Sequence, residues 1–564
     1  MKNSKFSLLL ILTLVLSVFL AACGGNDTDK TTGNKEEKGG DTAKTDVPQE
    51  MKVLDSAEIP TMDTVLAEGS TSFTYINNVG EGLYRLDQEG KAVPALAEGD
   101  PTTNEDKTVY TFKLRDSKWS NGEPVTAQDF VFAWQRAIDP KTASPYGPYM
   151  MNGKIKGAQE ITNAAADKKD YDLNTLGVVA KDEKTLEVTL EKAFPFAADL
   201  FAFPTFYPQN EKFVTEKGDQ YASNAENMIY NGPFTMTEWD GPAGAEWVLE
   251  KNDTYWDADS VKLNKITVNV VKDPGAQVNA FEANETDVTG LLSSDLVPTY
   301  EGDDRMFSEL SASVFWLKMN QKNEALQNLN IRKAIAQGFN KDDLAASILN
   351  NASVPANYMV PQNFVSLDGK DFREKNGDLI TYNLEEAQKA WKAGLKELGV
   401  DKLTIRYLGG DTEASKKIDS YMKNQLEKNL PGLTVELESV PFAVRLERDN
   451  SMDYDLQAAG WGPDYGDAIS FADLWVTDGG SNRMGYSNKE YDKLIKAAQT
   501  DLATDPKANF EALQEAERIL LQEDFGIAPI YQRAENFLIN PKVKNIATYQ
   551  YGPDYCYKWV TIEE

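Results

Sequence analysis

The N-terminal segment most restricts how this chain folds, because it separates a leader and a tether from the folding body. Residues 1–22 begin with two lysines, continue with a mostly apolar run of 15 residues at 6–20, and end in small residues. This layout is typical of a cleavable export signal, and the run is shorter than the ~20 residues of a membrane-spanning helix. Residues 24–50 contain a single large apolar side chain, a valine. We therefore expect a solvated tether, followed by a body that starts at about residue 51.

The end of the export signal carries a cysteine. Leu20-Ala21-Ala22-Cys23, followed by glycine, resembles the lipobox of bacterial lipoproteins. The resemblance implies that Cys23 becomes the lipidated first residue of the mature chain, anchored to the outer face of the cell membrane in a single-membrane bacterium. Cys556 is the one other cysteine. No disulfide can therefore form within the mature body, and we expect Cys556 to be a buried thiol.

The body is long enough to need more than one hydrophobic core. Of the 564 residues, 514 follow residue 50, which favours two or three domains. No second apolar segment approaches the length that spans a bilayer. Removal of the signal takes the formal net charge from −31 to −33. This charge argues against a nucleic-acid partner, because its phosphates would be repelled.

The absence of histidine excludes several kinds of catalytic site. Ser-His-Asp and Cys-His systems cannot form, and the commonest zinc ligand is missing, so we expect no metal and no cofactor. Two carboxylates can still hydrolyse glycosides, but among 89 acidic residues a suitable pair is expected by chance. The chain contains no G-x-S-x-G, P-loop or Rossmann glycine motif in a suitable setting. The residues therefore give no support for an enzyme.

Hydrophobic periodicity predicts strands and helices in both halves. Alternating side chains predict strands at 107–115 and 183–192. Thr126 and Asp129 form a capping-box pattern at the start of a helix that runs to 139. The C-terminal half alternates helical and strand patterns, which favours an α/β sheet. Its helical patterns lie at 331–349, 383–399, 414–430 and 507–524, and its strand patterns at 403–408 and 433–440.

Several segments, in consistent order from about Ser56 to the C-terminus, resemble one known family. They are EGLYRLDQEGKAVPALAE, SKWSNGEPVTAQDFVFAWQRAIDPKTASPYGPY, YNGPFTMTEW, LEKNDTYWD, LNIRKAIAQGFNKDDL and GWGPDYGDAISF. The chain is similar in these segments to the extracellular solute-binding proteins of family 5, and within them to oligopeptide receptors. The resemblance implies a monomeric receptor that gives peptides to the membrane subunits of an ABC importer.

The resemblance also implies a fold: α/β, bilobal and periplasmic-binding-protein-like, with an additional small lobe and hinge closure around the ligand. The first lobe is expected to be discontinuous, and the small lobe to be an insertion in it. The implied boundaries are 51–80, 206–311 and 535–564 for lobe I, 81–205 for lobe II, and 312–534 for lobe III.

A ligand-binding role is implied for the aspartate of the G-W-x-x-D-Y motif, which is Asp464 here. In the family this carboxylate meets the α-amine of the peptide, a charge-assisted contact that water exclusion strengthens. Gly460 would supply close backbone access and Trp461 an apolar wall. The residues alone leave an alternative, because Pro463 and Asp464 also suit an ordinary tight turn.

Other residues are expected around the same cleft. Glu68, Gly69 and Ser70 resemble the segment whose backbone pairs with the peptide. Tyr146 resembles a tyrosine near its amino end, and a tyrosine brings both a ring and a hydroxyl. Trp316 is placed in the same space, with the hydrophobic core as its alternative.

The sequence departs from the family at Ala458, where the well-known peptide receptors carry a basic residue that meets the peptide carboxylate. Candidates for this role here are Arg406, Arg445, Arg448 and Lys318. A receptor without a fixed partner for the peptide carboxylate would accept longer ligands. Two other functions stay open: a receptor of the same fold for a signalling peptide, a sugar or a nickel complex, and a secreted carboxylate hydrolase.

Overall fold

The computed structural model describes residues 47–194 and 196–564. The predicted signal, the lipidation site at Cys23 and most of the predicted tether lie outside the described residues. The first strand, β1 (Glu50–Asp55), begins one residue before the predicted start of the body. No helix in the described ranges has the length and apolar character needed to cross a membrane.

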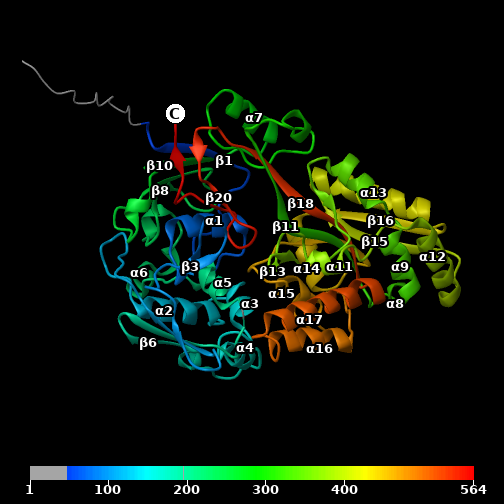
Figure 1. Cartoon of the computed structure of the whole chain (residues 1–564), viewed down its shortest axis with the longest axis horizontal. Coiled ribbons are helices and arrows are strands. Elements are labelled where there is room, and N and C mark those ends of the chain that lie inside the picture. The colour runs from blue at the N-terminus through cyan, green and yellow to red at the C-terminus, as the bar shows by residue number, and fades with distance from the viewer. Residues whose placement is uncertain (1–46, 195) are drawn as a thin grey trace, which may run out of the picture. The chain divides into compact units, whose positions relative to one another are not determined.

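One four-stranded sheet contains the first strand of the described chain. Its order is β1-β10-β9-β8, with β1 parallel to β10 (Lys265–Val270), and with β9 (Glu246–Lys251) and β8 (Phe234–Trp239) antiparallel to their neighbours. The side chain of Gln49 exchanges hydrogen bonds of 2.9 and 3.0 Å with the backbone of Ile562. Figure 1 shows the N-terminal strand β1 beside the C-terminal strands. Segments from both ends of the chain therefore build one part of the fold.

A second four-stranded sheet lies entirely within 102–189. Its order is β4 (Thr102–Thr103), β5 (Val109–Lys113), β7 (Thr185–Thr189) and β6 (Val178–Asp182), and the predicted strands at 107–115 and 183–192 pair in it as β5 and β7. The predicted helix is α2 (Ala127–Ile138), whose start is held by the Asp129 carboxylate accepting from the Thr126 backbone N–H at 2.8 Å. The helices that follow in this part are α3 (Gly147–Met151), α4 (Ala158–Ala166) and α5 (Ala197–Ala202).

The third sheet has six strands and contains the predicted α/β region. Parallel strands β15 (Leu403–Gly410) and β16 (Leu433–Val440) are joined by helix α13 (Glu413–Asn429). The sheet order is β12 (Val354–Pro355), β18 (Ile527–Leu538), β11 (Met306–Met319), β17 (Leu456–Trp461), β15 and β16. Its other long helices are α9 (Leu329–Gln337), α12 (Leu384–Leu398), α16 (Lys489–Gln499) and α17 (Pro506–Arg518).

Strands β11 and β18 connect the third sheet to the first part of the fold, as Figure 1 shows. They pair antiparallel from Met306 opposite Leu538 to Lys318 opposite Ile527, with an irregularity between Leu310 and Val314. Both strands cross the predicted boundaries between lobes I and III. A long two-stranded connection of this kind is where a hinge would lie, and the exact lobe boundaries stay a prediction.

One segment that was predicted to be a single helix is broken in the structure. The pattern at 331–349 forms α9, which ends at Gln337, and then a separate short helix, α10 (Lys341–Asp343), with a π-helical turn at 344–349. The side chain of Asn340 accepts hydrogen bonds from the backbone N–H groups of Asp342 and Asp343, at 3.1 and 3.2 Å. Asn340 therefore starts a new helix where the hydrophobic period alone predicts one helix.

Candidate functional site

Asp464 lies in the loop after β17, and its carboxylate meets two tyrosines from the segment around α3. The Tyr149 hydroxyl donates to one carboxylate oxygen at 2.7 Å, and the Tyr146 hydroxyl donates to the other at 3.3 Å. Asp464 is 7% exposed. Burial raises its pKa to about 6, although both tyrosines and the Lys154 charge favour the ionised form. The carboxylate is thus placed where an added cation would stabilise its charge.

Local packing fixes the position of Tyr146. Its ring stacks on Phe203 at 5.8 Å and meets the edge of Phe73, on α1 (Ser70–Val79), at 5.1 Å. Directly after this tyrosine the backbone passes close to α2, since an added Cβ on Gly147 would lie 1.8 Å from the Ala137 carbonyl oxygen. Only glycine therefore permits this close approach between α2 and α3.

The motif residues before Asp464 end β17. Trp461 is half-buried, and its ring lies 6.4 Å from that of Tyr149, edge to face. Gly460 pairs with Phe315 on β11, and an added Cβ would lie 2.5 Å from the Phe315 ring. That ring stacks on Tyr531 at 4.6 Å. The missing side chain at Gly460 therefore makes room for an aromatic pair on the strand surface.

The segment Glu68 to Ser70 leads into α1, whose first residue is Ser70, and lies near Tyr146. Glu68 and Ser70 are exposed, and Gly69 has an extended backbone with φ −126° and ψ 150°. The Glu68 charge is one of those that raise the pKa of Tyr146, after burial and Asp464. Within the described part of the chain, the backbone N–H groups of Glu68 and Gly69 donate no hydrogen bond. They are available to an added extended chain.

The structure places Trp316 in the hydrophobic core. Its side chain is 2% exposed and packs against Trp475 at 5.3 Å. The expectation that Trp316 lines the cleft is therefore corrected in favour of its core alternative. Its neighbour Phe315, half-buried, is the aromatic residue that β11 presents beside Gly460.

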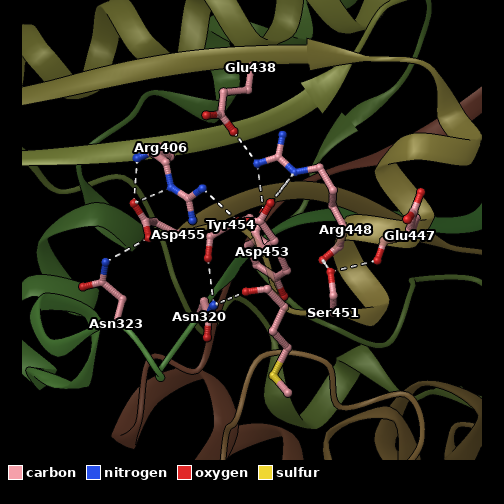
Figure 2. Close-up of polar contacts among 11 residues, drawn as sticks. Asn320, Asn323, Arg406, Glu438, Glu447, Arg448, Ser451, Asp453, Tyr454 and Asp455 are labelled. Carbon is pink, nitrogen blue, oxygen red and sulfur yellow. Dashed lines mark hydrogen bonds and ion pairs between the residues drawn. The ribbon is translucent and has the colours of Figure 1, made fainter.

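Three of the four candidates for a ligand carboxylate already have carboxylate partners, two of them drawn in Figure 2. Arg406 pairs with Asp453 at 2.9 Å, and Arg448 contacts Glu438 and Asp453. Lys318 forms an ion pair with Asp449. Arg445 donates to the carbonyl oxygen of Ala458 at 2.7 Å. It therefore lies beside the position from which the expected basic side chain is missing.

Sequence reasoning missed two polar residues at this site, Tyr149 and Lys154. Tyr149 follows Tyr146 by three residues, a spacing that puts both on one helix face, so a signal for it was present. Lys154 had no such signal in the sequence. Its ammonium donates to the Tyr149 carbonyl oxygen at 3.3 Å.

Comparison with known proteins identifies the family to which the chain belongs. Residues 91–483 match the model of the bacterial extracellular solute-binding proteins, family 5. The chain is 34% identical over 545 residues to the dipeptide-binding protein DppE of Bacillus subtilis, and 34% identical over 556 residues to the oligopeptide-binding protein OppA of the same species. Each alignment covers 96% of both chains.

A solved structure agrees with these sequence matches. Listeria monocytogenes OppA bound to peptide is 43% identical and superposes with a TM-score of 0.79, over 92% of this chain and 99% of that one. The bilobal α/β architecture expected from the sequence is confirmed by this likeness. The chain belongs to the bacterial extracellular solute-binding proteins of family 5.

Proposed function

We propose that this protein is the peptide receptor of an ABC importer and that Asp464 binds the α-amine of an extended peptide. The observation that carries the proposal is a carboxylate only 7% exposed, held between the segment of Tyr146 and the end of β17. The names of the relatives, which bind dipeptides or oligopeptides, support a peptide as the ligand class.

The chemistry of the site suits an ammonium group. An ionised carboxylate has about four lone-pair positions, and the two tyrosine hydroxyls use two of them. A ligand ammonium can therefore add hydrogen bonds without displacing either tyrosine. Burial strengthens the attraction, since little water screens it. The free backbone N–H groups at Glu68 and Gly69 would bind the main chain of the peptide, so the receptor would not have to recognise the peptide side chains.

The test is a search for bound ligand. The purified body is incubated with a random peptide pool, and the species that co-purify are identified by mass spectrometry. We expect intact peptides of mixed sequence. Shortened peptides would instead indicate a hydrolase, one dominant sequence a receptor for a signalling peptide, and no peptide a receptor for another solute such as a sugar or a nickel complex.

Binding should depend on pH on both sides of neutrality. The empty site carries Asp464 with a pKa of about 6, and a bound ammonium lowers that pKa by favouring the charged form. Affinity is then constant between about pH 6 and 8 and falls below pH 6, by up to about tenfold per unit, as the empty site takes up a proton. Above about pH 8 the peptide amine loses its charge. Calorimetry across pH 4.5 to 9 checks this, and a flat acid limb would contradict it.

We further propose that the receptor works outside the cell, held by a lipid on Cys23. This part rests on the sequence L-A-A-C-G behind a charged start and an apolar run. A lipid anchor would keep a receptor near the importer, where an unanchored one would diffuse away from a cell with a single membrane.

A further inference from the structure

A cavity of about 170 Å³, lined by both charged and apolar side chains, lies next to Tyr465, the neighbour of Asp464 in the chain. Two basic and two acidic side chains line it, namely Lys154, Lys192, Asp467 and Asp473. Across the described ranges, these four side chains form no ion pair with one another. Since about 10–15 Å³ holds one water molecule, the cavity gives a long side chain room to move.

Lys154 stands between this cavity and the amine site. Its ammonium lies 5.6 Å from the ring centre of Tyr149 and 5.9 Å from that of Tyr465. Tyr149, which accepts from Lys154 through its carbonyl oxygen, is the residue whose hydroxyl donates to Asp464. A movement of Lys154 would therefore affect Tyr149 and, through its hydroxyl, the hydrogen bond to the Asp464 carboxylate.

Two carboxylates act on the Lys154 ammonium. Burial lowers the pKa of Lys154, while the charges of Asp473 and, to a smaller extent, Asp464 act in the opposite direction. Lys192 is half-buried and acts on Asp473 and Lys154. Asp467 acts on Asp473 but on neither lysine. The carboxylates that act on the Lys154 ammonium are thus Asp473 and Asp464.

Asp464, Asp473 and Lys154 together can balance the charge of one ligand cation. Two carboxylates and one ammonium give a net charge of −1, which matches the single charge of a peptide α-amine. Without Asp473 the group is neutral, and Asp464 is the remaining carboxylate that acts on Lys154. A buried ammonium gains much from a carboxylate partner, so Lys154 would then occupy the place of the ligand amine.

We propose that Asp473 is a positioning residue of the amine site: it holds the Lys154 ammonium on the cavity side and so keeps Asp464 free for the ligand. The proposal rests on the proposed role of Asp464. Asp473 itself touches no ligand in this arrangement, and its effect on binding passes entirely through Lys154.

A double-mutant cycle tests the proposal, with calorimetry of one free-amine peptide against the parent, Asp473→Asn, Lys154→Met and the double variant. We expect Asp473→Asn to weaken binding about tenfold or more, the size of effect that charge pairing produces at buried sites. In the Lys154→Met background the same change should cost less than about twofold, because the internal competitor is gone. Asp467→Asn is the matched control from the same cavity and should leave the affinity unchanged.

Two results would overturn the proposal. One is parent-like binding by Asp473→Asn. The other is an equal penalty in both backgrounds, which would mean that Asp473 acts on the ligand directly through its field. Thermal unfolding checks that each variant is folded, and Lys154→Gln replaces Lys154→Met in the cycle if the latter is not.

The same measurements separate this inference from the proposed function. If Asp464→Asn and acetylation of the peptide amine both leave binding unchanged, the amine site itself is wrong. If both weaken binding but the Asp473→Asn penalty persists without Lys154, the amine site stands and only the positioning role fails.

Discussion

Replacement of Asp464 by asparagine is expected to weaken binding of a free-amine peptide by about 2–4 kcal/mol, or about 30- to 1,000-fold in Kd. The substitution keeps the size of the side chain and an oxygen that can accept from the 2.7 Å Tyr149 contact. It removes the charge that we propose faces the ligand ammonium. That ammonium would then be buried near Lys154 with no counter-charge beside it, a cost much larger than one neutral hydrogen bond.

The matching change on the ligand side gives the control. A peptide acetylated at its N-terminus loses the cation while its main chain stays intact, so the parent protein should lose affinity for it to a similar degree. Combined, the two changes should cost little more than either alone, because both remove the same ion pair. Calorimetry of the four combinations measures this. Normal binding of the acetylated peptide by the parent protein would contradict the role of Asp464.

Elements with strong local signals could be predicted from the sequence. Helix α2 starts directly after Thr126 because Asp129 caps the Thr126 backbone, and this pairing is visible in the sequence spacing. The parallel strands β15 and β16 follow from alternating side chains on either side of a helical pattern. The break before Asn340 was also signalled, by a capping asparagine followed by two aspartates in the first turn, and the hydrophobic period hid it.

The same distinction between local signals and long-range contacts applies to the residues of the candidate site. Asp464 could be proposed from the sequence because its motif is contiguous. Its partner Tyr149 lies 315 residues earlier, and only the folded chain brings their oxygens together. Trp316 shows the opposite case, since an apolar strand residue beside a cleft and one in the core have the same local sequence. Burial and partner, rather than residue type, decide between such alternatives.

Replacement of Glu517 by alanine is expected to lower the free energy of unfolding by about 3–5 kcal/mol, as removal of one partner from a buried ion pair does. Glu517, on α17, is fully buried and forms an ion pair with Arg373, whose side chain is 9% exposed. Its carboxylate also accepts from the backbone N–H groups of Met359 and Val360, at 2.9 and 3.0 Å. Alanine would leave a buried guanidinium and these two donors without their acceptor.

The same helix offers a matched control in Glu515. This residue pairs with Arg518 three positions later, at 2.6 Å, but both side chains are more than a third exposed. Solvent-exposed pairs contribute about 0–1 kcal/mol, so Glu515→Ala should leave stability almost unchanged. Urea unfolding, with hydrogen exchange over 359–376 and 506–518 to locate the loss, compares the two variants. Equal midpoints would show that the buried network around Glu517 adds no more stability than a surface pair.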